Sequence, residues 1–245
     1  MSSSTSPVSL SPARRAWRRF QRNRLGYWSL LAFCALVLLS LGAELVSNDR
    51  PLVVRYAGQT YWPMLHDYPE TVFGGDFQTP TDYLDPFIRA QLRQDGNWAL
   101  YTLNPYGANT INYFAEQPNP APPSAANWLG TDDRGRDLLA QLLYGFRVSV
   151  LFGLALTATG VLLGVLTGAI QGYLGGKTDL AFQRFIEIWG SMPELYLLII
   201  FSAVLAPSIG LLLVLLSLFG WMGLSDYVRA EFLRNRQLDY VKAAR

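Results

Sequence analysis

Residues 146–170 read FRVSVLFGLALTATGVLLGVLTGAI, and this apolar stretch decides the fold class. Its only charged side chain is Arg147, close to its beginning. A helix rises about 1.5 Å per residue, so roughly 20 apolar residues in succession cross the hydrocarbon core of a bilayer. Soluble helices instead place apolar residues along one face and polar residues along the other. The stretch therefore predicts a transmembrane helix.

One similar run precedes this stretch and two follow it. The first, residues 27–46, has Glu44 as its only charged side chain and no small-residue cleavage site close behind it, which indicates a retained anchor. The third, residues 185–206, is interrupted by Pro193, and the fourth covers residues 208–224. We therefore predict an all-α integral membrane protein that crosses the bilayer about four times, its last two spans forming a helical hairpin.

Glycines recur inside the stretch that decides the fold. They stand at Gly153, Gly160, Gly164 and Gly168, the last three spaced by four. A face of small residues lets a second helix approach closely, which is one way in which membrane helices associate. The alternative is that the helix merely tolerates these glycines, and the sequence leaves both readings open.

The basic residues set the expected orientation. Residues 1–26 hold six arginines and no acidic residue, so the positive-inside rule places the N-terminus in the cytoplasm, and four crossings return the C-terminus there. Residues 47–145 hold six arginines and eleven acidic residues, which suits an external segment. We interpret residues 1–26 as a basic cytoplasmic segment, either an interfacial helix on the lipid surface or a disordered topology signal. Nucleic-acid binding fits poorly beside a transmembrane helix.

The segment of residues 47–145 is too long for a plain loop and too rich in aromatic residues for disorder. We predict a small mixed α+β periplasmic insert followed by a linker. Its expected elements are a hairpin (52–56 and 59–64), a short helix within 81–94 begun by Thr81 or Asp82, a strand (98–103) and a proline-rich extended linker (117–124).

The sequence offers no catalytic set. Its single histidine, His66, and single cysteine, Cys34, exclude a Cys/His metal site, a Ser-His-Asp triad and an intrachain disulfide. The pair Asp132 and Asp133 reads as solvated loop residues or helix caps, and no phosphate-binding loop occurs. We therefore expect neither an enzyme nor a cofactor, and any ATP would be hydrolysed on a partner.

Residues 129–153, LGTDDRGRDLLAQLLYGFRVSVLFG, strongly resemble the beginning of the transport domain in permease subunits of dipeptide/oligopeptide ABC importers. The matching positions are Gly130, Thr131, Asp132, Gly135, Arg136, Asp137, Gly145, Arg147, Ser149 and Gly153. The resemblance continues through residues 172–179, which contain Gly175, Gly176 and Asp179, through Arg184 and Pro193, and into residues 239–245. Residues 48–52, NDRPL, together with the long insert, resemble the YejE-type peptide/microcin permeases more narrowly.

The resemblance implies a type I ABC importer transmembrane fold with six helices, of which this chain holds about four. Residues 146–245 would be an incomplete permease domain that ends in the cytoplasmic coupling loop. The implied function is that of a transmembrane subunit translocating peptides by alternating access. The implied partners are a second permease subunit, ATP-binding subunits, a periplasmic solute-binding protein, the peptide substrate and membrane lipid. The implied location is the bacterial inner membrane, with several spans and both ends cytoplasmic.

The resemblance also assigns roles to the last residues of the chain. In this family the corresponding stretch opens the loop that docks on the ATPase, and small side chains let it enter a cleft of that partner. The residues implied in coupling are Asp239, Tyr240, Val241, Ala243 and Ala244.

Two carboxylates suggest a transport path. Glu187 and Glu194 are seven residues apart, which would place them on one face of the third span, next to Pro193. An ionised carboxylate facing lipid costs about 2.5 kcal/mol or more at mid-bilayer, so we expect both to face protein or water. The alternative for Glu187 is a simple contact with Arg184. Both glutamates and Gln141 depart from the family pattern, which leaves the substrate undefined.

Two other functions remain open at this stage. A non-transporting membrane scaffold with an external binding insert would not depend on an ATPase, and an inactive truncated permease fragment would have no activity alone.

Overall fold

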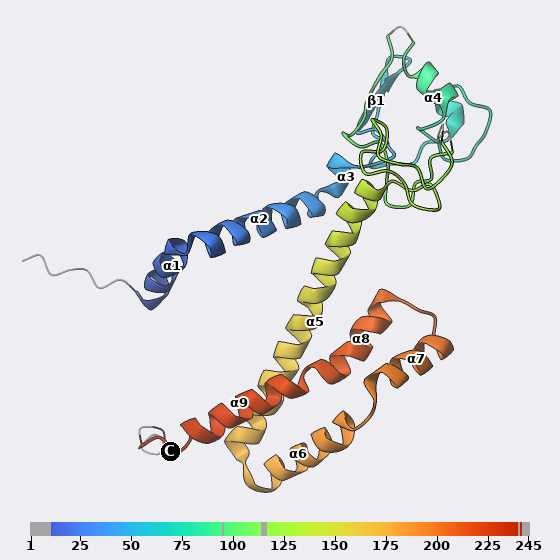
Figure 1. Ribbon diagram of the computed structural model, residues 1–245. Helices are drawn as coiled ribbons and strands as arrows, with labels where there is room; N and C mark the ends of the chain where they lie inside the picture. Colours follow the sequence, from blue (N-terminus) through green and yellow to red (C-terminus); the bar gives the residue numbers. More distant parts are fainter. Residues whose placement is uncertain (1–10, 95, 114–116, 240, 242–245) are drawn as a thin grey trace, which may run out of the picture. The chain divides into compact units, whose positions relative to one another are not determined.

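The computed structural model describes residues 11–94, 96–113, 117–239 and 241, and it divides into two compact units at Val148 and Ser149. The predicted fold class is confirmed: the chain is mostly helical, with a small three-stranded sheet (Figure 1). Among the described residues, three helices are long and apolar enough to cross a membrane, or four if one bent pair counts as a single span.

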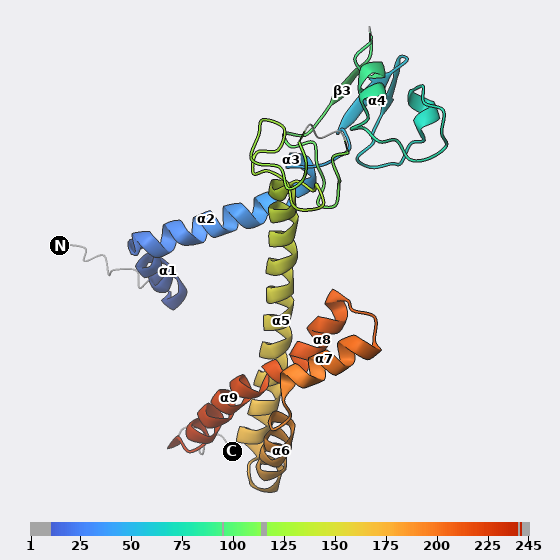
Figure 2. The ribbon, with the colours of Figure 1, turned by 45° about the vertical axis from the view of Figure 1, so that its right-hand side comes forward.

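The first unit begins with α1 (Pro12–Arg22), α2 (Arg24–Leu41) and α3 (Ala43–Val46). The side chain of Asn23 accepts a hydrogen bond from the backbone of Gly26 and so begins α2, while α1 folds back beside it (Figure 2). Within the predicted run of residues 27–46 the helix is interrupted at Gly42, between α2 and α3. Glycine is a residue type that weakens helices.

The insert, residues 47–145, contains an antiparallel sheet of β1 (Val53–Tyr56), β2 (Gln59–Tyr61) and β3 (Trp98–Leu100), in the order β2-β1-β3. These strands confirm the predicted hairpin and third strand. The short helices are η1 (Glu70–Phe73) and α4 (Pro86–Gln91). The predicted helix within 81–94 is shorter than expected, because Asp85 caps it and Pro86 occupies its first turn.

A core of buried apolar side chains lies between the sheet and the short helices. It brings together Val54, Phe73, Tyr83, Ile88 and Leu92. The ring of Phe73 meets Tyr56, Tyr61, Tyr68 and Tyr83 edge to face, with centroids 5.3 to 6.2 Å apart. Such aromatic pairs add about 0.5 to 1.5 kcal/mol each beyond their buried area, so the insert has a core of the kind found in small soluble domains.

The apolar stretch of residues 146–170 lies within one helix, α5 (Leu138–Leu174), which begins eight residues before the expected span. After a break at Gly175 the chain continues as α6 (Gly176–Gly190). Helix therefore flanks Gly175 on both sides.

The second unit continues with α7 (Glu194–Val204), α8 (Ile209–Gly220) and α9 (Met222–Asn235). Helices α6 and α7 are bent by 67° at residues 191–193, and α7 and α8 form the predicted hairpin. Helices α8 and α9 together make a 27-residue helical segment that contains an apolar window of 18 residues, and the segment extends beyond the predicted run of residues 208–224. Figures 1 and 2 both show α9 beside the C-terminal half of α5.

Candidate functional site

The first group of motif residues, 130–137, forms a hydrogen-bonded turn in front of α5. Asp137 is fully buried and accepts hydrogen bonds from the side-chain amides of Asn104 (2.8 Å) and Asn127 (2.9 Å) and from the backbone of Ala140 (2.8 Å). The bond to Ala140 satisfies a backbone donor in the first turn of α5. Asp137 therefore fixes where α5 begins.

The neighbouring motif residues hold the turn itself. The carboxylate of Asp132 accepts hydrogen bonds from the backbone of Arg136 (2.8 Å) and from its guanidinium (2.7 Å), and one from the side chain of Gln141 (3.0 Å). Burial works to raise the pKa of Asp132, but these bonds outweigh it and hold that pKa well below its usual range. Gln141, which departs from the family pattern, thus serves the same turn.

The remaining residues of this group complete the turn in different ways. Thr131 is buried and donates to the side chain of Asn119 (2.9 Å), while its hydroxyl accepts from the backbone of Ala121 (2.8 Å). Gly130 and Gly135 are buried, and the backbone oxygen of Ala121 lies directly against Gly130. Gly145 is exposed and open space surrounds it among the described residues.

Arg147, the only charged residue in residues 146–170, pairs with the only charged residue of the first run. Its guanidinium donates to Glu44 in α3 at 2.7 Å and lies 5.1 Å from the ring centre of Tyr144. The hydroxyl of Tyr144 donates to the backbone of Ser47 (2.8 Å). Sequence reasoning missed this pair, although one lone acid and one lone base in two apolar runs was a usable signal.

The glycine face of α5 meets α9 in the second unit. A methyl group on Gly164 would lie 2.9 Å from Cβ of Leu224, and one on Gly168 would lie 2.5 Å from the backbone oxygen of Ser225. Gly172, one step further along, lies directly against Phe232. Gly153 has open space around it among the described residues. The structure thus decides between the two readings: close packing at Gly164 and Gly168, tolerance at Gly153.

Polar side chains join α5, α6 and α9 next to this glycine face, and we call this group the α5–α6–α9 junction. Gln171 and Ser225 are fully buried, and the amide of Gln171 donates to the hydroxyl of Ser225 (2.9 Å). Gln183 in α6 donates to Gln171 (2.9 Å). Asp179 in α6 accepts two hydrogen bonds from Arg229 in α9, one of them 2.7 Å long. The motif residue Asp179 thus fastens α6 to α9.

The turn between α5 and α6 completes the junction. Gly175 and Gly176 have φ of +63° and +57°, a left-handed conformation that favours glycine. Gly175 is buried beneath the guanidinium of Arg236, which follows α9. Three residues later the chain reaches the predicted coupling segment. Asp239 and Val241 are helical and belong to the described residues, whereas Tyr240, Ala243 and Ala244 lie outside them.

The two glutamates of the expected transport path do not share a helix face. Glu187 lies in α6 and Glu194 begins α7, because the helix ends at Gly190 and Pro193 precedes the next one. Proline removes a backbone donor and disfavours helical geometry in the residue before it, which accounts for the break. The expected common face is therefore wrong. Glu187 instead accepts a hydrogen bond from Arg184 at 2.5 Å, and both side chains are more than half exposed.

Over residues 11–94, 96–113, 117–239 and 241, no three histidine, cysteine, aspartate or glutamate side chains are placed so that they could hold a metal ion. The groups described above instead hold helices in place. The fold and these contacts define a polytopic helical membrane protein whose helices meet at glycines and at a few polar pairs.

Comparisons with known proteins agree with this class. Residues 160–245 match the family described as binding-protein-dependent transport system inner membrane component, and residues 11–80 match the N-terminal TM domain of oligopeptide transport permease C. The inner membrane ABC transporter permease protein YejE of Escherichia coli is 52% identical over 96% of this chain and 69% of its own length.

Two further relatives extend the comparison. The peptidoglycan transport system permease protein YejE of Agrobacterium fabrum is 44% identical over 95% of this chain and 67% of its own length. The dipeptide transport system permease protein DppC of Bacillus subtilis is 36% identical over 51% of this chain and 39% of its own length. The chain belongs to the family of peptide ABC transporter permeases, and within it to the YejE type.

Proposed function

We propose that this chain is the transmembrane permease subunit of an ATP-driven importer that takes peptides from a solute-binding protein. One relative along almost the whole chain is named for a peptidoglycan transport system, and one along about half of it for a dipeptide transport system, which supports this substrate class. The observation that carries the mechanism is the α5–α6–α9 junction. It joins three helices to the segment that runs into residues 239–245.

The junction suggests how an ATPase partner would move the transmembrane helices. In the proposed mechanism, Asp239, Tyr240, Val241, Ala243 and Ala244 dock on the partner, which hydrolyses the ATP. The pair between Asp179 and Arg229 and the close contact at Gly168 would then pass the displacement from α9 to α6 and α5. If α5, α6 and α9 tilt together rather than one at a time, the transport path would open to one side of the membrane and then to the other, which is alternating access.

The break between α6 and α7 is our candidate for the transport path. Pro193 and Glu194 stand where helix hydrogen bonding is interrupted, and Glu187 lies one turn before the end of α6. We propose that Glu194 faces water or a peptide ammonium group, because an ionised carboxylate is costly in lipid. Replacement Glu194→Gln should lower peptide uptake by the complete transporter, and unchanged uptake would remove Glu194 from the path.

The topology that we propose keeps both ends in the cytoplasm and the insert in the periplasm. It divides the chain into a basic segment (1–26), a first span (27–46), the insert with its linker (47–145) and the permease domain (146–245). The six arginines of residues 1–26 and the acidic excess of the insert support this orientation. The partners would be a second permease subunit, ATP-binding subunits and a periplasmic solute-binding protein.

Peptide uptake by reconstituted proteoliposomes tests this proposal. The chain, its partner subunits and the binding protein are reconstituted together, and uptake of a labelled peptide is measured with ATP inside the vesicles. Replacement Ala243→Trp should lower uptake and peptide-stimulated ATPase activity at least about tenfold, because a bulky side chain would block docking. The control Ala230→Trp alters an exposed alanine of α9 and should leave both near wild type.

Two results would contradict the proposal. One is peptide uptake that continues without ATP, as a passive channel would show. The other is an Ala243→Trp transporter with wild-type uptake and ATPase activity, which would fit a membrane scaffold whose C-terminal segment contacts no motor.

A further inference from the structure

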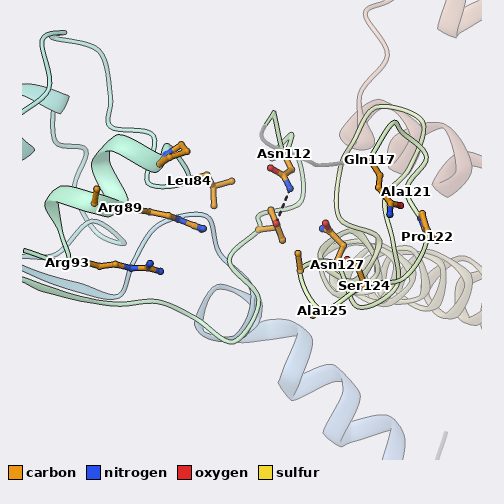
Figure 3. Close-up of a pocket in the computed structure, with 14 residues that line it drawn as sticks. Leu84, Arg89, Arg93, Asn112, Gln117, Ala121, Pro122, Ser124, Ala125 and Asn127 are labelled. Carbon is orange, nitrogen blue, oxygen red and sulfur yellow. Dashed lines mark hydrogen bonds between the residues drawn. The ribbon is translucent and has the colours of Figure 1, made fainter.

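A cavity of about 640 Å³ lies within the insert, between α4 and the loop of residues 117–127 (Figure 3). Its volume falls in the range of about 300 to 1,000 Å³ that is typical of small-molecule sites. The lining residues that the structure describes all belong to the first unit. The cavity lies apart from the α5–α6–α9 junction and from the coupling segment in the sequence, and of the described residues only Asn127 is shared with the network around Asp137.

Two arginines form one wall. Arg89 lies in α4, Arg93 follows two residues after its end, and both side chains line the cavity. Figure 3 shows both side chains extending from α4 toward the opposite loop. The Nε atom of Arg89 donates to the backbone oxygen of Tyr83 (3.1 Å), and its guanidinium lies 5.5 Å from the ring centre of Tyr101. Arg89 is thus held in position before any ligand arrives.

The charge of the cavity is opposite to that of the insert around it. Residues 47–145 contain eleven acidic residues and six arginines, yet none of the acidic residues that the structure describes lines the cavity. Among the described residues, neither Arg89 nor Arg93 forms an ion pair. Two guanidinium groups that face one cavity without a carboxylate partner favour an anionic ligand, because arginine binds carboxylates through two parallel hydrogen bonds.

The opposite wall supplies amides and small apolar surfaces. Asn112 donates to the hydroxyl of Tyr106 (3.2 Å), and Asn127 donates to the buried carboxylate of Asp137 (2.9 Å). These bonds fix both side chains, and the carbonyl oxygen of Asn127 is of the kind that accepts a hydrogen bond from a ligand's N–H group. Leu84 and Pro122 add apolar surface to the same cavity. The ligand that fits this lining carries a carboxylate at one end and amide groups and small apolar side chains beyond it.

We propose that this cavity binds a short peptide by its C-terminal carboxylate, which Arg89 and Arg93 receive while the loop of residues 117–127 contacts the rest of the peptide. The choice of a peptide rests on the proposed transport function, whereas the choice of a carboxylate rests on the two arginines. The insert thereby holds a second peptide site, outside the helices that carry the transport path.

Calorimetric titration of the purified full chain in detergent micelles tests the site with three probes. Trialanine with a free C-terminus should bind saturably, and trialanine amide at least about tenfold more weakly, because the amide removes the negative charge. Inorganic phosphate should not displace trialanine at equal concentration. Equal binding of the free acid and the amide, or displacement by phosphate, would overturn the proposal and leave a general anion site or none.

Substitution separates this cavity from any other peptide site on the chain. Arg93→Gln changes an exposed residue and leaves the contacts of Arg89 with Tyr83 and Tyr101 in place. It should lower trialanine affinity at least about tenfold. It should also remove the preference for trialanine over trialanine amide. Arg55→Gln, an exposed arginine of β1 away from the cavity, should change neither. Wild-type affinity in Arg93→Gln would overturn the assignment.

The titration needs neither ATP nor partner subunits, so its outcome is separate from that of the uptake experiment. If trialanine does not bind, the proposal that the cavity is a peptide site is refuted, even if the complete transporter imports peptides. If the complete transporter takes up no peptide, this result counts against the proposed transport function, even if Arg93→Gln lowers trialanine affinity.

Discussion

The insert and the helices of the second unit are held together by different forces. The insert buries Phe73, Val54 and Ile88 in an apolar core and places Asp137 and Asn104 in a buried hydrogen-bond network. In the second unit the buried side chains are few, and the 18-residue apolar windows of its candidate spans are at most 17% buried. Large apolar side chains such as Leu154, Ile199 and Val204 are exposed instead.

This difference follows from the solvent that surrounds each region, which is water for the insert and lipid for the helices of the second unit. In water, burying apolar surface stabilises a fold, so the insert gathers its aromatic residues inside. In lipid that driving force between helices is absent, and close packing and hydrogen bonds determine which helices meet. Gly168 against Ser225, and Asp179 against Arg229, are contacts of these two kinds. A substitution should therefore act differently in the two regions.

The largest effect is expected at Asp137. Replacement Asp137→Ala leaves the buried amide of Asn127 without its acceptor, takes one from Asn104, and removes the bond to the first turn of α5. Breaking such a buried charged network should cost about 3 to 5 kcal/mol of the free energy of unfolding. Thermal unfolding of the full chain in detergent, followed by near-ultraviolet circular dichroism, measures it.

Asp133 supplies the matched control for this substitution. It is an exposed aspartate in the same turn, so Asp133→Ala should change the free energy of unfolding by less than about 0.5 kcal/mol. A comparable loss in the two variants would mean that the turn tolerates no change at all and that the network around Asp137 is not the cause.

A smaller effect is expected where α5 meets α9. A side chain at position 168 would clash with the backbone oxygen of Ser225 (2.5 Å) and with Cβ of Val228 (2.8 Å). Gly168→Leu should therefore force the helices apart, at about 1 to 3 kcal/mol by analogy with overpacked cores. Cross-linking between cysteines introduced in α5 and α9 measures the separation, and thermal unfolding in detergent measures the cost.

Gly153→Leu is the control on the same helix, since the structure places nothing within 4 Å of that position among the described residues. Its cross-linking and unfolding temperature should match wild type. If Gly153→Leu and Gly168→Leu behaved alike, the contact between α5 and α9 would not determine the packing of this unit.

Apolar clustering and local turn chemistry made much of this fold predictable. The apolar run of residues 146–170 predicted a membrane helix, and the runs of residues 52–56 and 59–64 predicted the hairpin of β1 and β2. Helix ends were predicted less well, because they depend on contacts between residues far apart in the chain. Asp137 fixes the start of α5 through hydrogen bonds that include one from Asn104, 33 residues earlier in the chain. The hydropathy of the sequence does not reveal that bond.

The candidate site shows the same limit. Spacing by four made Gly164 and Gly168 visible as a face, but the sequence did not say which helix would meet it or that Gly153 would stay open. The spacing of Glu187 and Glu194 gave a wrong prediction, because helical periodicity holds only while the helix continues and Pro193 interrupts it. The pair Asp179–Arg229 joins residues 50 positions apart, and only the fold brings them together.

The smallest effect is expected for two ion pairs of the second unit, one that joins two helices and one within a single helix. The side chains of Asp179 and Arg229 are 16% and 27% exposed, whereas those of Glu187 and Arg184 are 58% and 67% exposed. Exposed ion pairs contribute about 0 to 1 kcal/mol, and a more buried pair that joins two helices should couple more strongly. We therefore expect a coupling energy of about 1 kcal/mol between Asp179 and Arg229 in a double-mutant cycle with Asp179→Asn and Arg229→Gln. The cycle with Arg184→Gln and Glu187→Gln, within one helix, should give about 0.5 kcal/mol or less. The cycles are compared through unfolding in detergent, and equal coupling in both would show that the pair of Asp179 and Arg229 does not fasten α6 to α9 more strongly than an exposed pair within one helix would.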